Sequence, residues 1–318
     1  MPAPREFEII ERFFTRPPTD AAVRIGIGDD AAVVEATGSI AVAVDTLVAG
    51  THFPQVIEAR ALGHRSLAVN LSDLAAVGAK PRWATLALSL PQVDRVFLED
   101  FATGFFDLAD RYSVSLIGGD TTRGPLSVTV QVIGDQGTEP MLRCGGCVGD
   151  HVFVSGSLGA AAAALDYLDL DADQRSGAAS AVIEHFGYPE PRVELGLALS
   201  GIAHAAIDIS DGLVADLGQL CAQSKCGAVI DLEALPISEH LQSLYPGENG
   251  QRLALHGGDD YELCFAVAPA DADRAREAAV SVGTPITLIG ELTGEPGISG
   301  RSDGTRVVLE PEGFIHFE

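Results

Sequence analysis

Residues 151–164, HVFVSGSLGAAAAA, have the pattern of a β-strand that passes through a glycine-rich turn into an α-helix. His151–Val154 is apolar and rich in valine, Ser155–Gly159 supplies turn residues, and a run of alanine, the strongest helix former, follows. Further apolar runs of strand length lie downstream, at residues 205–209, 228–232, 263–267 and 286–289. Strands separated by helical stretches predict an α/β or α+β fold for this half of the chain.

The N-terminal half shows the same alternation. Residues 58–79 predict a helix on which Asn70 and Asp73, three positions apart, form a polar face. A second helix is predicted at 94–112. Strands are predicted at residues 40–44, 83–90, 113–117 and 127–133.

Length and composition favour two domains. A chain of 318 residues, 47% of them hydrophobic, can bury two cores. The stretch 141–150 is rich in glycine and other turn residues, which is typical of a boundary. We therefore expect domains at 1–140 and 141–318, each a mixed sheet backed by helices.

The charge balance argues against nucleic acid as a partner. Lys and Arg total 20 and Asp and Glu total 45, so the formal net charge is −25, which repels a polyanion. No stretch is as long and apolar as a membrane span, and the N-terminus lacks a signal-peptide core. The expected location is the cytoplasm, with no membrane partner.

The cysteines predict reduced thiols. Five cysteines are an odd number and too few for a disulfide-stapled secreted fold. Cys144 and Cys147 form a C-x-x-C pair, but no second such pair or H-x-x-x-H completes the four ligands of a structural zinc site. Cys221, Cys226 and Cys264 lie in apolar patterns and are interpreted as core residues.

The strongest chemical signal is a series of aspartates where apolar runs meet glycine turns. Any one of them can be explained as a turn or cap residue, but a solvated surface does not produce five. The five segments are residues 26–30 (GIGDD), 44–46 (VDT), 118–121 (GGDT), 207–212 (IDISDG) and 257–262 (GGDDYE).

Carboxylates gathered in one site repel one another unless they take up protons or bind cations. Oxygen ligands favour Mg²⁺ or Ca²⁺ over zinc, and Mg²⁺ would let acidic side chains approach a polyphosphate. The sequence contains no P-loop motif and only two lysines, Lys80 and Lys225, so the neutralising positive charge must come from metal and a few arginines. Backbone N–H groups of the Gly118–Gly119 turn could contact phosphates.

Six motifs resemble those of the thiamine-monophosphate kinase family, within the superfamily of aminoimidazole ribonucleotide synthetase and selenophosphate synthetase. The resemblance spans nearly the whole chain, and VDTLVAGTHF together with NLSDLAAVGAKP is its most specific part. In order, the motifs are GIGDDAAV (26–33), VDTLVAGTHF (44–53), NLSDLAAVGAKP (70–81), LIGGDTTRGPLS (116–127), IDISDGL (207–213) and HGGDDYELCF (256–265).

The resemblance implies a two-domain aminoimidazole ribonucleotide synthetase-like fold. The N-terminal sheet would contribute to the barrel of a homodimer, and the active site would lie in the cleft between the domains. The apolar stretch Trp83–Leu90 agrees with a homodimer, on the interpretation that it forms a sheet edge that needs covering.

The resemblance also assigns roles to residues. The aspartates would ligate Mg²⁺, with Asp45, Asp73 and Asp120 acting in transition-state charge stabilisation. Arg143, Ser210 and the backbone of Gly119 would contact ATP, and His52, Asp259 and Phe314 would contact thiamine monophosphate. The metal ligands implied are Asp30, Asp45, Asp73, Asp120, Asp208 and Asp211.

This chain departs from the family pattern at two places. Ala43 and Val44 stand where many relatives carry hydroxyl residues, so an ion at Val44 would have to use a backbone carbonyl or water. Asp259 stands where many relatives have Glu, which keeps the carboxylate on a shorter arm.

The expected activity is transfer of the ATP γ-phosphoryl group to the phosphate of thiamine monophosphate, with Mg²⁺ as cofactor. Two alternatives stay open. The chain could be another ATP-dependent synthetase of the same superfamily, although a selenophosphate synthetase should carry a reactive Cys near its N-terminus and the first cysteine here is Cys144. It could also be a non-catalytic sensor of Mg-nucleotide.

Overall fold

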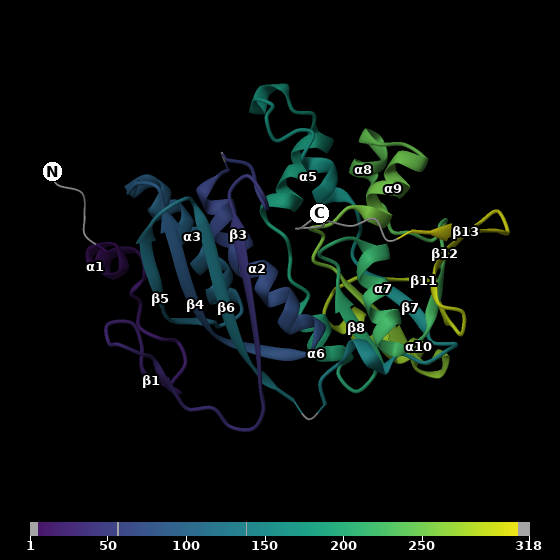
Figure 1. Ribbon diagram of the computed structural model, residues 1–318, viewed down its shortest axis with the longest axis horizontal. Helices are drawn as coiled ribbons and strands as arrows, with labels where there is room; N and C mark the ends of the chain where they lie inside the picture. Colours follow the sequence, from purple (N-terminus) through teal and green to yellow (C-terminus); the bar gives the residue numbers. More distant parts are fainter. Residues whose placement is uncertain (1–5, 56, 138, 311–318) are drawn as a thin grey trace. The chain divides into compact units, whose positions relative to one another are not determined.

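A computed structural model describes residues 6–55, 57–137 and 139–310, which form two compact units (Figure 1). Unit 1 comprises residues 1–74 and 79–137, and unit 2 comprises residues 75–78 and 138–318. Both contain mixed sheets backed by helices, which confirms the predicted fold class. The predicted boundary at 140/141 and the dimer barrel stay predictions.

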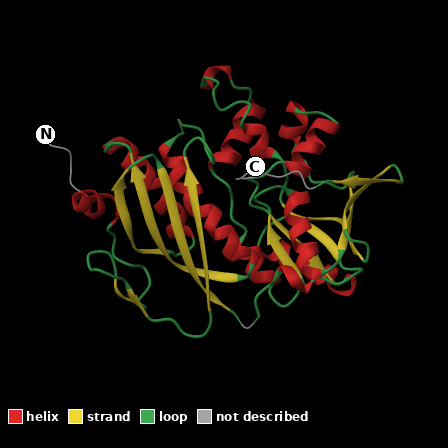
Figure 2. Cartoon of the chain, in the orientation of Figure 1, coloured by secondary structure: helices red, strands yellow, loops and turns green. Residues whose placement is uncertain are grey.

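Unit 1 is built on a four-stranded sheet (Figure 2), whose strands lie in the order β3-β6-β4-β5, as labelled in Figure 1. β3 and β4 run antiparallel to β6, and β5 runs parallel to β4. The elements are α1 (Glu6–Ile9), the π-helix η1 (Ile10–Phe14), β1 (Val23–Ile25), β2 (Val33–Val34), β3 (Ile40–Val48), α2 (Ala59–Ala76), β4 (Ala79–Leu90), α3 (Arg95–Arg111), β5 (Ser115–Arg123) and β6 (Ser127–Gln136).

Helices α2 and α3 cross closely. A Cβ at Gly63 would lie 2.0 Å from the Phe101 carbonyl oxygen, and one at Gly104 would lie 1.9 Å from that of Arg60. Only glycine permits this approach, which allows Phe101 and other large apolar side chains of the two helices to become fully buried.

The strands of unit 1 are longer than the sequence predicted. β3 was expected to end at Val44 and β5 at Ile117, but they continue to Val48 and Arg123. Asp45 and Asp120 therefore lie inside strands, not in turns after them, because the pairing with β6 and β4 extends past both. β4 is a central strand, so the interpretation of Trp83–Leu90 as a sheet edge was wrong; the edges are β3 and β5.

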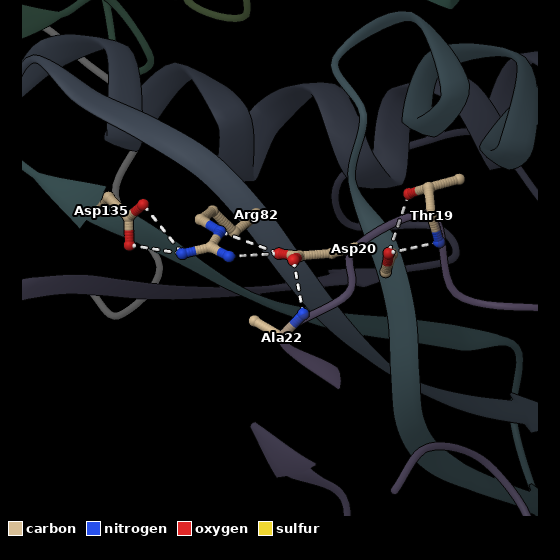
Figure 3. A network of polar contacts seen from close by, with 6 residues as sticks. Thr19, Asp20, Ala22, Arg82 and Asp135 are labelled. Carbon is tan, nitrogen blue, oxygen red and sulfur yellow. Dashed lines mark hydrogen bonds and ion pairs between the residues drawn. The ribbon is translucent and has the colours of Figure 1, made fainter. Parts of the chain in front are cut away.

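An ion-pair network ties the segment before β1 to the sheet (Figure 3). Arg82 of β4 donates from Nε and Nη2 to Asp20 Oδ2, at 2.8 and 2.6 Å, and from Nη1 to Asp135 Oδ2 at 2.9 Å. Asp20 Oδ1 accepts from the Ala22 N–H at 2.9 Å. Burial alone would raise the pKa of Asp20, but these hydrogen bonds and the guanidinium charge outweigh it and lower the pKa.

We expect Asp20→Asn to lower the free energy of unfolding by about 1–3 kcal/mol, because Arg82 loses a shielded charged acceptor. The control is Asp110→Asn, whose partner Arg16 is exposed; it should change stability by less than about 0.5 kcal/mol. A lowered pKa means that the Asp20 contribution is present above its ordinary value of 3.8 and is lost as pH falls through the folded-state value. Urea denaturation at several pH values measures both effects, and equal losses in the two variants would contradict the expectation.

Unit 2 contains a seven-stranded sheet in the order β13-β12-β9-β11-β7-β10-β8. Only β9 and β12 pair in parallel; the other neighbours are antiparallel. The strands are β7 (His151–Ser155), β8 (Ala205–Asp208), β9 (Gly227–Asp231), β10 (Leu263–Val267), β11 (Ile286–Thr293), β12 (Gly297–Ser302) and β13 (Thr305–Leu309).

The helices of unit 2 include α7, whose residues Leu213, Leu217 and Leu220 are buried in one core with Val152, Val154 and other strand residues. The helical elements are the 3-10 helices η2 (Arg143–Gly145), η3 (Ala172–Gln174) and η4 (Pro269–Asp271), and the α-helices α4 (Ala160–Ala164), α5 (Gly177–Gly187), α6 (Val193–Leu199), α7 (Leu213–Ser224), α8 (Glu239–Leu244), α9 (Glu248–His256) and α10 (Ala272–Ser281). Residues 151–164 are therefore strand β7, a glycine-rich turn and helix α4, as predicted.

Candidate active site

Unit 1 contains a cavity of about 740 Å³ that brings three predicted site residues together. Asp30, Gly119 and Asp120 all line it, although Asp30 is 89 and 90 positions from the other two in the sequence. The rest of the lining is mixed: it includes the apolar Ile27, Leu86 and Leu116 and the acidic Glu6, Glu11 and Asp29. A volume of this order is typical of a small-molecule site.

Gly119 is required by the geometry of β5. The register between β4 and β5 shifts at Ala84/Thr85, which leaves Ile117 as an extra residue. Gly119 then has φ of +148°, and a Cβ there would lie 1.8 Å from the Leu86 carbonyl oxygen. Any side chain at this position would push β5 away from β4 and displace the neighbouring Asp120.

A buried asparagine connects the strand that carries Asp45 to the helix that carries Asp73. Asn70 of α2 is fully buried; its Oδ1 accepts from the Asp45 N–H at 2.9 Å, and its Nδ2 donates to the Ser66 carbonyl at 3.0 Å. Asp73 lies on the same helix face, one turn further along. The predicted polar pair thus divides its roles: Asn70 fixes the backbone, and Asp73 stays half-buried beside it.

Within unit 1, Asp45 and Asp120 do not lie side by side. β6 and β4 separate their strands, so their backbones are roughly 14 Å apart at three strand spacings. Asp45 pairs across the sheet with Val130 and, through it, with Leu86, and both are buried. Asp120 pairs with Ala87, which is exposed. Because paired residues point to the same face, Asp45 and Asp120 face opposite sides of the sheet. Val44, which alternates with Asp45, is 57% exposed.

His52 lies in the turn that follows β3. Its Nδ1 accepts from the Val48 N–H at 3.0 Å, and its own N–H donates to the Val48 carbonyl at 2.9 Å. Acceptance at Nδ1 places the proton of the neutral imidazole on Nε2. His52 can therefore offer a donor from Nε2.

In unit 2, Asp208 ends β8 and Ser210 and Asp211 form the loop that leads into α7. Asp216, in the first turn of α7, holds this loop: its Oδ2 accepts from the N–H groups of Ser210, Asp211 and Gly212 at 3.0, 3.0 and 3.1 Å. Burial, and then the charges of Asp208 and Asp211, raise the pKa of Asp216 to about 7. The sequence did not predict a role for Asp216, although an acidic residue in the first helical turn after SDG is a recognisable signal.

The GGDDYE loop lies directly against the loop of Ser210. The Asp259 N–H donates to the Ser210 carbonyl at 2.8 Å, and the Tyr261 hydroxyl donates to Asp259 Oδ1 at 2.9 Å. Asp259 has φ of +69°, and a Cβ at Gly258 would lie 2.3 Å from the Ser210 carbonyl oxygen. The structure thus brings Asp259 beside Ser210.

The other two acidic residues of the same motif are buried structural groups. Asp260 Oδ2 accepts from the Gly159 N–H at 2.8 Å, and Glu262 pairs with Arg192 and accepts from the Ser155 hydroxyl. Burial raises the pKa of Asp260 well above its usual range, with the Glu262 charge adding to the effect. Of the three carboxylates in this motif, Asp259 alone stays half-exposed.

The structure does not bring Arg143 to the loops of Ser210 and Asp259. Arg143 is exposed in η2, and the neighbouring Leu142 bridges to Ala205 at the start of β8, whereas Ser210 follows the end of that strand. Phe314 lies outside the described residues.

The predicted metal ligands of unit 1 and those of unit 2 are both suited to hard cations. Every predicted side-chain ligand offers carboxylate oxygens, which Mg²⁺ prefers, and Val44 could contribute only its backbone carbonyl.

None of the helices in the described ranges has the length and apolarity needed to cross a membrane.

Comparison with known proteins identifies the family. The family models for the N-terminal and C-terminal domains of AIR synthase related protein match residues 28–135 and 148–303. Thiamine-monophosphate kinase of Escherichia coli K12 is 44% identical over 98% of both chains. The crystal structure of thiamine-monophosphate kinase from Stenotrophomonas maltophilia K279a is 42% identical, with a TM-score of 0.85, and covers 94% of this chain and 95% of its own.

A structure of AaThiL complexed with AMPPCP and TMP is 32% identical, with a TM-score of 0.79 and coverage of 92% of each chain. The relatives and the family models agree over both units. The chain therefore belongs to the thiamine-monophosphate kinase family of AIR synthase related proteins.

Proposed function

We propose that this chain transfers the γ-phosphoryl group of ATP to the phosphate of thiamine monophosphate, giving thiamine diphosphate and ADP. The observation that carries the proposal is near full-length identity of 44% to a thiamine-monophosphate kinase. It is supported by the cavity that gathers Asp30, Gly119 and Asp120 and by the loop pair of Ser210 and Asp259. The AaThiL complex with AMPPCP and TMP supports the same two ligands.

The transfer is a direct in-line displacement. An oxygen of the acceptor phosphate forms a bond to the γ-phosphorus as the bond to the β–γ bridging oxygen breaks, and ADP leaves with that electron pair. With a second pKa near 6, a phosphate monoester is already largely deprotonated near neutral pH, so no general base is needed. When bound, Mg²⁺ supplies charge neutralisation for the phosphates.

The residues proposed to hold Mg²⁺ are the six carboxylates, with the Val44 carbonyl as a further oxygen. Gly119, Arg143 and Ser210 are proposed to contact ATP, and His52, Asp259 and Phe314 to contact thiamine monophosphate. The ligating aspartates are Asp30, Asp45, Asp73 and Asp120 of unit 1 and Asp208 and Asp211 of unit 2. ATP as co-substrate favours the cytoplasm as the location.

The decisive experiment measures ATP consumption with and without thiamine monophosphate. The proposal expects ADP release only when the acceptor is present, together with thiamine diphosphate in equal amount. Nucleotide binding without turnover would favour the sensor alternative. Equal turnover with pyridoxal phosphate or a nucleoside monophosphate would contradict the substrate assignment.

His52 supports the acceptor side, because the neutral tautomer that accepts at Nδ1 carries its proton on Nε2, and that N–H can donate to a phosphate oxygen. We expect His52→Asn to raise KM for thiamine monophosphate by about 10- to 150-fold, which corresponds to the loss of one hydrogen bond to a charged group, about 1.5–3 kcal/mol. The Asn amide oxygen can still accept from the Val48 N–H, so the turn should persist. KM for ATP should change little.

His52→Gln is the matched control, since its amide nitrogen reaches close to the position of Nε2 while the contact at Nδ1 is lost. In steady-state kinetics, KM for thiamine monophosphate should be closer to the wild-type value in His52→Gln than in His52→Asn. Wild-type KM for thiamine monophosphate in His52→Asn would remove His52 from the substrate site.

We further propose a homodimer. On the edge strand β3, the alternating residues Ile40, Val42 and Val44 expose 47%, 52% and 57% of their surface. An apolar row on an edge strand favours a second chain as its cover. Light scattering at micromolar concentration should give twice the mass of 33.1 kDa; a monomer mass would refute the dimer.

A further inference from the structure

Three side chains with metal-ligating atoms meet in unit 2, outside the residues proposed for phosphoryl transfer. The Cys147 thiol, an Asp150 carboxylate oxygen and a His204 ring nitrogen all lie within 4.8 Å of one another. Cys147 and Asp150 precede β7, whereas His204 immediately precedes β8. We propose that these residues bind one zinc ion.

The turn that carries Cys147 and Asp150 is preformed. The Cys147 N–H donates to Asp150 Oδ2 at 2.8 Å, and the Asp150 N–H donates back to the Cys147 carbonyl at 3.0 Å. Gly149 has φ of +92°, as this tight turn requires. The turn is anchored to β11 by the pair Gly149 N–H to Leu292 carbonyl and Leu292 N–H to Asp150 carbonyl, both at 2.8 Å.

His204 is held against this turn by close backbone packing. A Cβ at Gly145 would lie 1.8 Å from the His204 carbonyl oxygen, so the two segments touch where only glycine fits. The His204 N–H donates to the Ala266 carbonyl at 2.9 Å, and its Nδ1 lies 2.9 Å from Asp150 Oδ2. The folded chain thus holds the backbone of the three proposed ligands in place before any metal binds.

Asp150 points to a cation. The residue is 3% exposed, and across the described ranges no Lys or Arg pairs with its carboxylate. A buried carboxylate needs a positive partner, which can be either a protonated His204 or a metal ion. The adjacent Cys147 thiol makes a weak contact with the Gly145 carbonyl, with Sγ and O 3.7 Å apart, and as a thiolate it is a strong ligand for a soft metal.

The donor set selects zinc over magnesium. Sulfur and imidazole ligands suit zinc, and three protein ligands leave a fourth position for water. Zinc ligands lie roughly 3.3–3.8 Å apart in a tetrahedral site, given bonds of about 2.0–2.3 Å. The three ligand atoms lie within 4.8 Å of one another, and rotation of the exposed Cys147 side chain can bring its sulfur to the shorter distance that zinc requires. The C-x-x-C pattern alone did not reveal this site because His204 is 54 positions from Asp150.

The test uses the full chain stripped of metal and kept in millimolar Mg²⁺, so that hard-cation sites are occupied. We expect one zinc per chain by competition with a chromogenic chelator. Co²⁺ in place of zinc should give a thiolate-to-cobalt charge-transfer band. Zinc that Mg²⁺ displaces, or a cobalt complex without that band, overturns the proposal.

Variants identify the ligands. Cys147→Ser and His204→Gln should each weaken zinc binding by at least about 100-fold, since even outer-shell partners cost 10- to 100-fold. Cys144→Ser is the matched control, as it removes the other exposed thiol of the pair, and should bind zinc as the wild type does. Equal binding by wild type and Cys147→Ser, or loss of binding in Cys144→Ser, overturns the assignment.

Both ligand variants alter exposed side chains, so circular dichroism of the metal-free proteins should match the wild type. Zinc binding is measured without nucleotide or acceptor. The outcome is therefore independent of the proposed kinase activity.

Discussion

Chelation with EDTA is expected to abolish ATP-dependent phosphoryl transfer, and Mg²⁺ is expected to restore it. Asp30 and Asp120 line the same cavity, and without a cation they would repel the phosphates of ATP. None of the described residues that line this cavity is a lysine or an arginine, so no basic side chain there can substitute for the metal. Measurement of ADP release before chelation, after it and after Mg²⁺ is restored tests this directly.

Addition of zinc alone is the control, because EDTA also removes zinc from the site proposed at Cys147, Asp150 and His204. Mg²⁺ without zinc should restore turnover, whereas zinc without Mg²⁺ should not, since the carboxylate sets are suited to hard cations. Full turnover in EDTA would refute the metal-dependent mechanism.

Motifs in the sequence identified segments of unit 1 that the fold brings together. The GIGDD and GGD segments predicted carboxylates and glycine turns around a phosphate ligand, and Asp30, Gly119 and Asp120 do line one cavity. The mixed sheets backed by helices also followed from local alternation of strands and helices. Local patterns succeed here because strand and helix periodicity is written in neighbouring residues.

Pairing between distant strands could not be predicted in the same way. The sequence suggested turns at Asp45 and Asp120, but the ladders with β6 and β4 carry both strands past these polar residues. Nothing near Trp83 in the sequence indicates that β4 lies between β6 and β5. Register and strand order depend on contacts between segments far apart, which one sequence does not display.

Burial likewise separates residues that look equivalent in a motif. Asp259, Asp260 and Glu262 belong to one short acidic segment, yet Asp260 and Glu262 are 1% exposed and bonded to the interior. Asp216 was overlooked because its role depends on three backbone N–H groups of the preceding loop. The roles of these acidic residues therefore depend on their hydrogen-bond and ion-pair partners, which only the fold reveals.

Asp120→Asn is expected to reduce kcat by about 10²- to 10³-fold, or about 2.7–4 kcal/mol, because a charge that stabilises the transition state is lost while the shape is kept. Asp120 is exposed on edge strand β5 and lines the cavity, so the fold should tolerate the change. Asp107→Asn, which removes the same charge from a surface pair with Arg60, is the control and should leave kcat within about twofold. Steady-state kinetics at saturating ATP and thiamine monophosphate, with thermal unfolding to verify folding, makes the comparison. A folded Asp120→Asn protein with nearly wild-type kcat would exclude Asp120 from the catalytic site and leave the cavity of unit 1 without its proposed role.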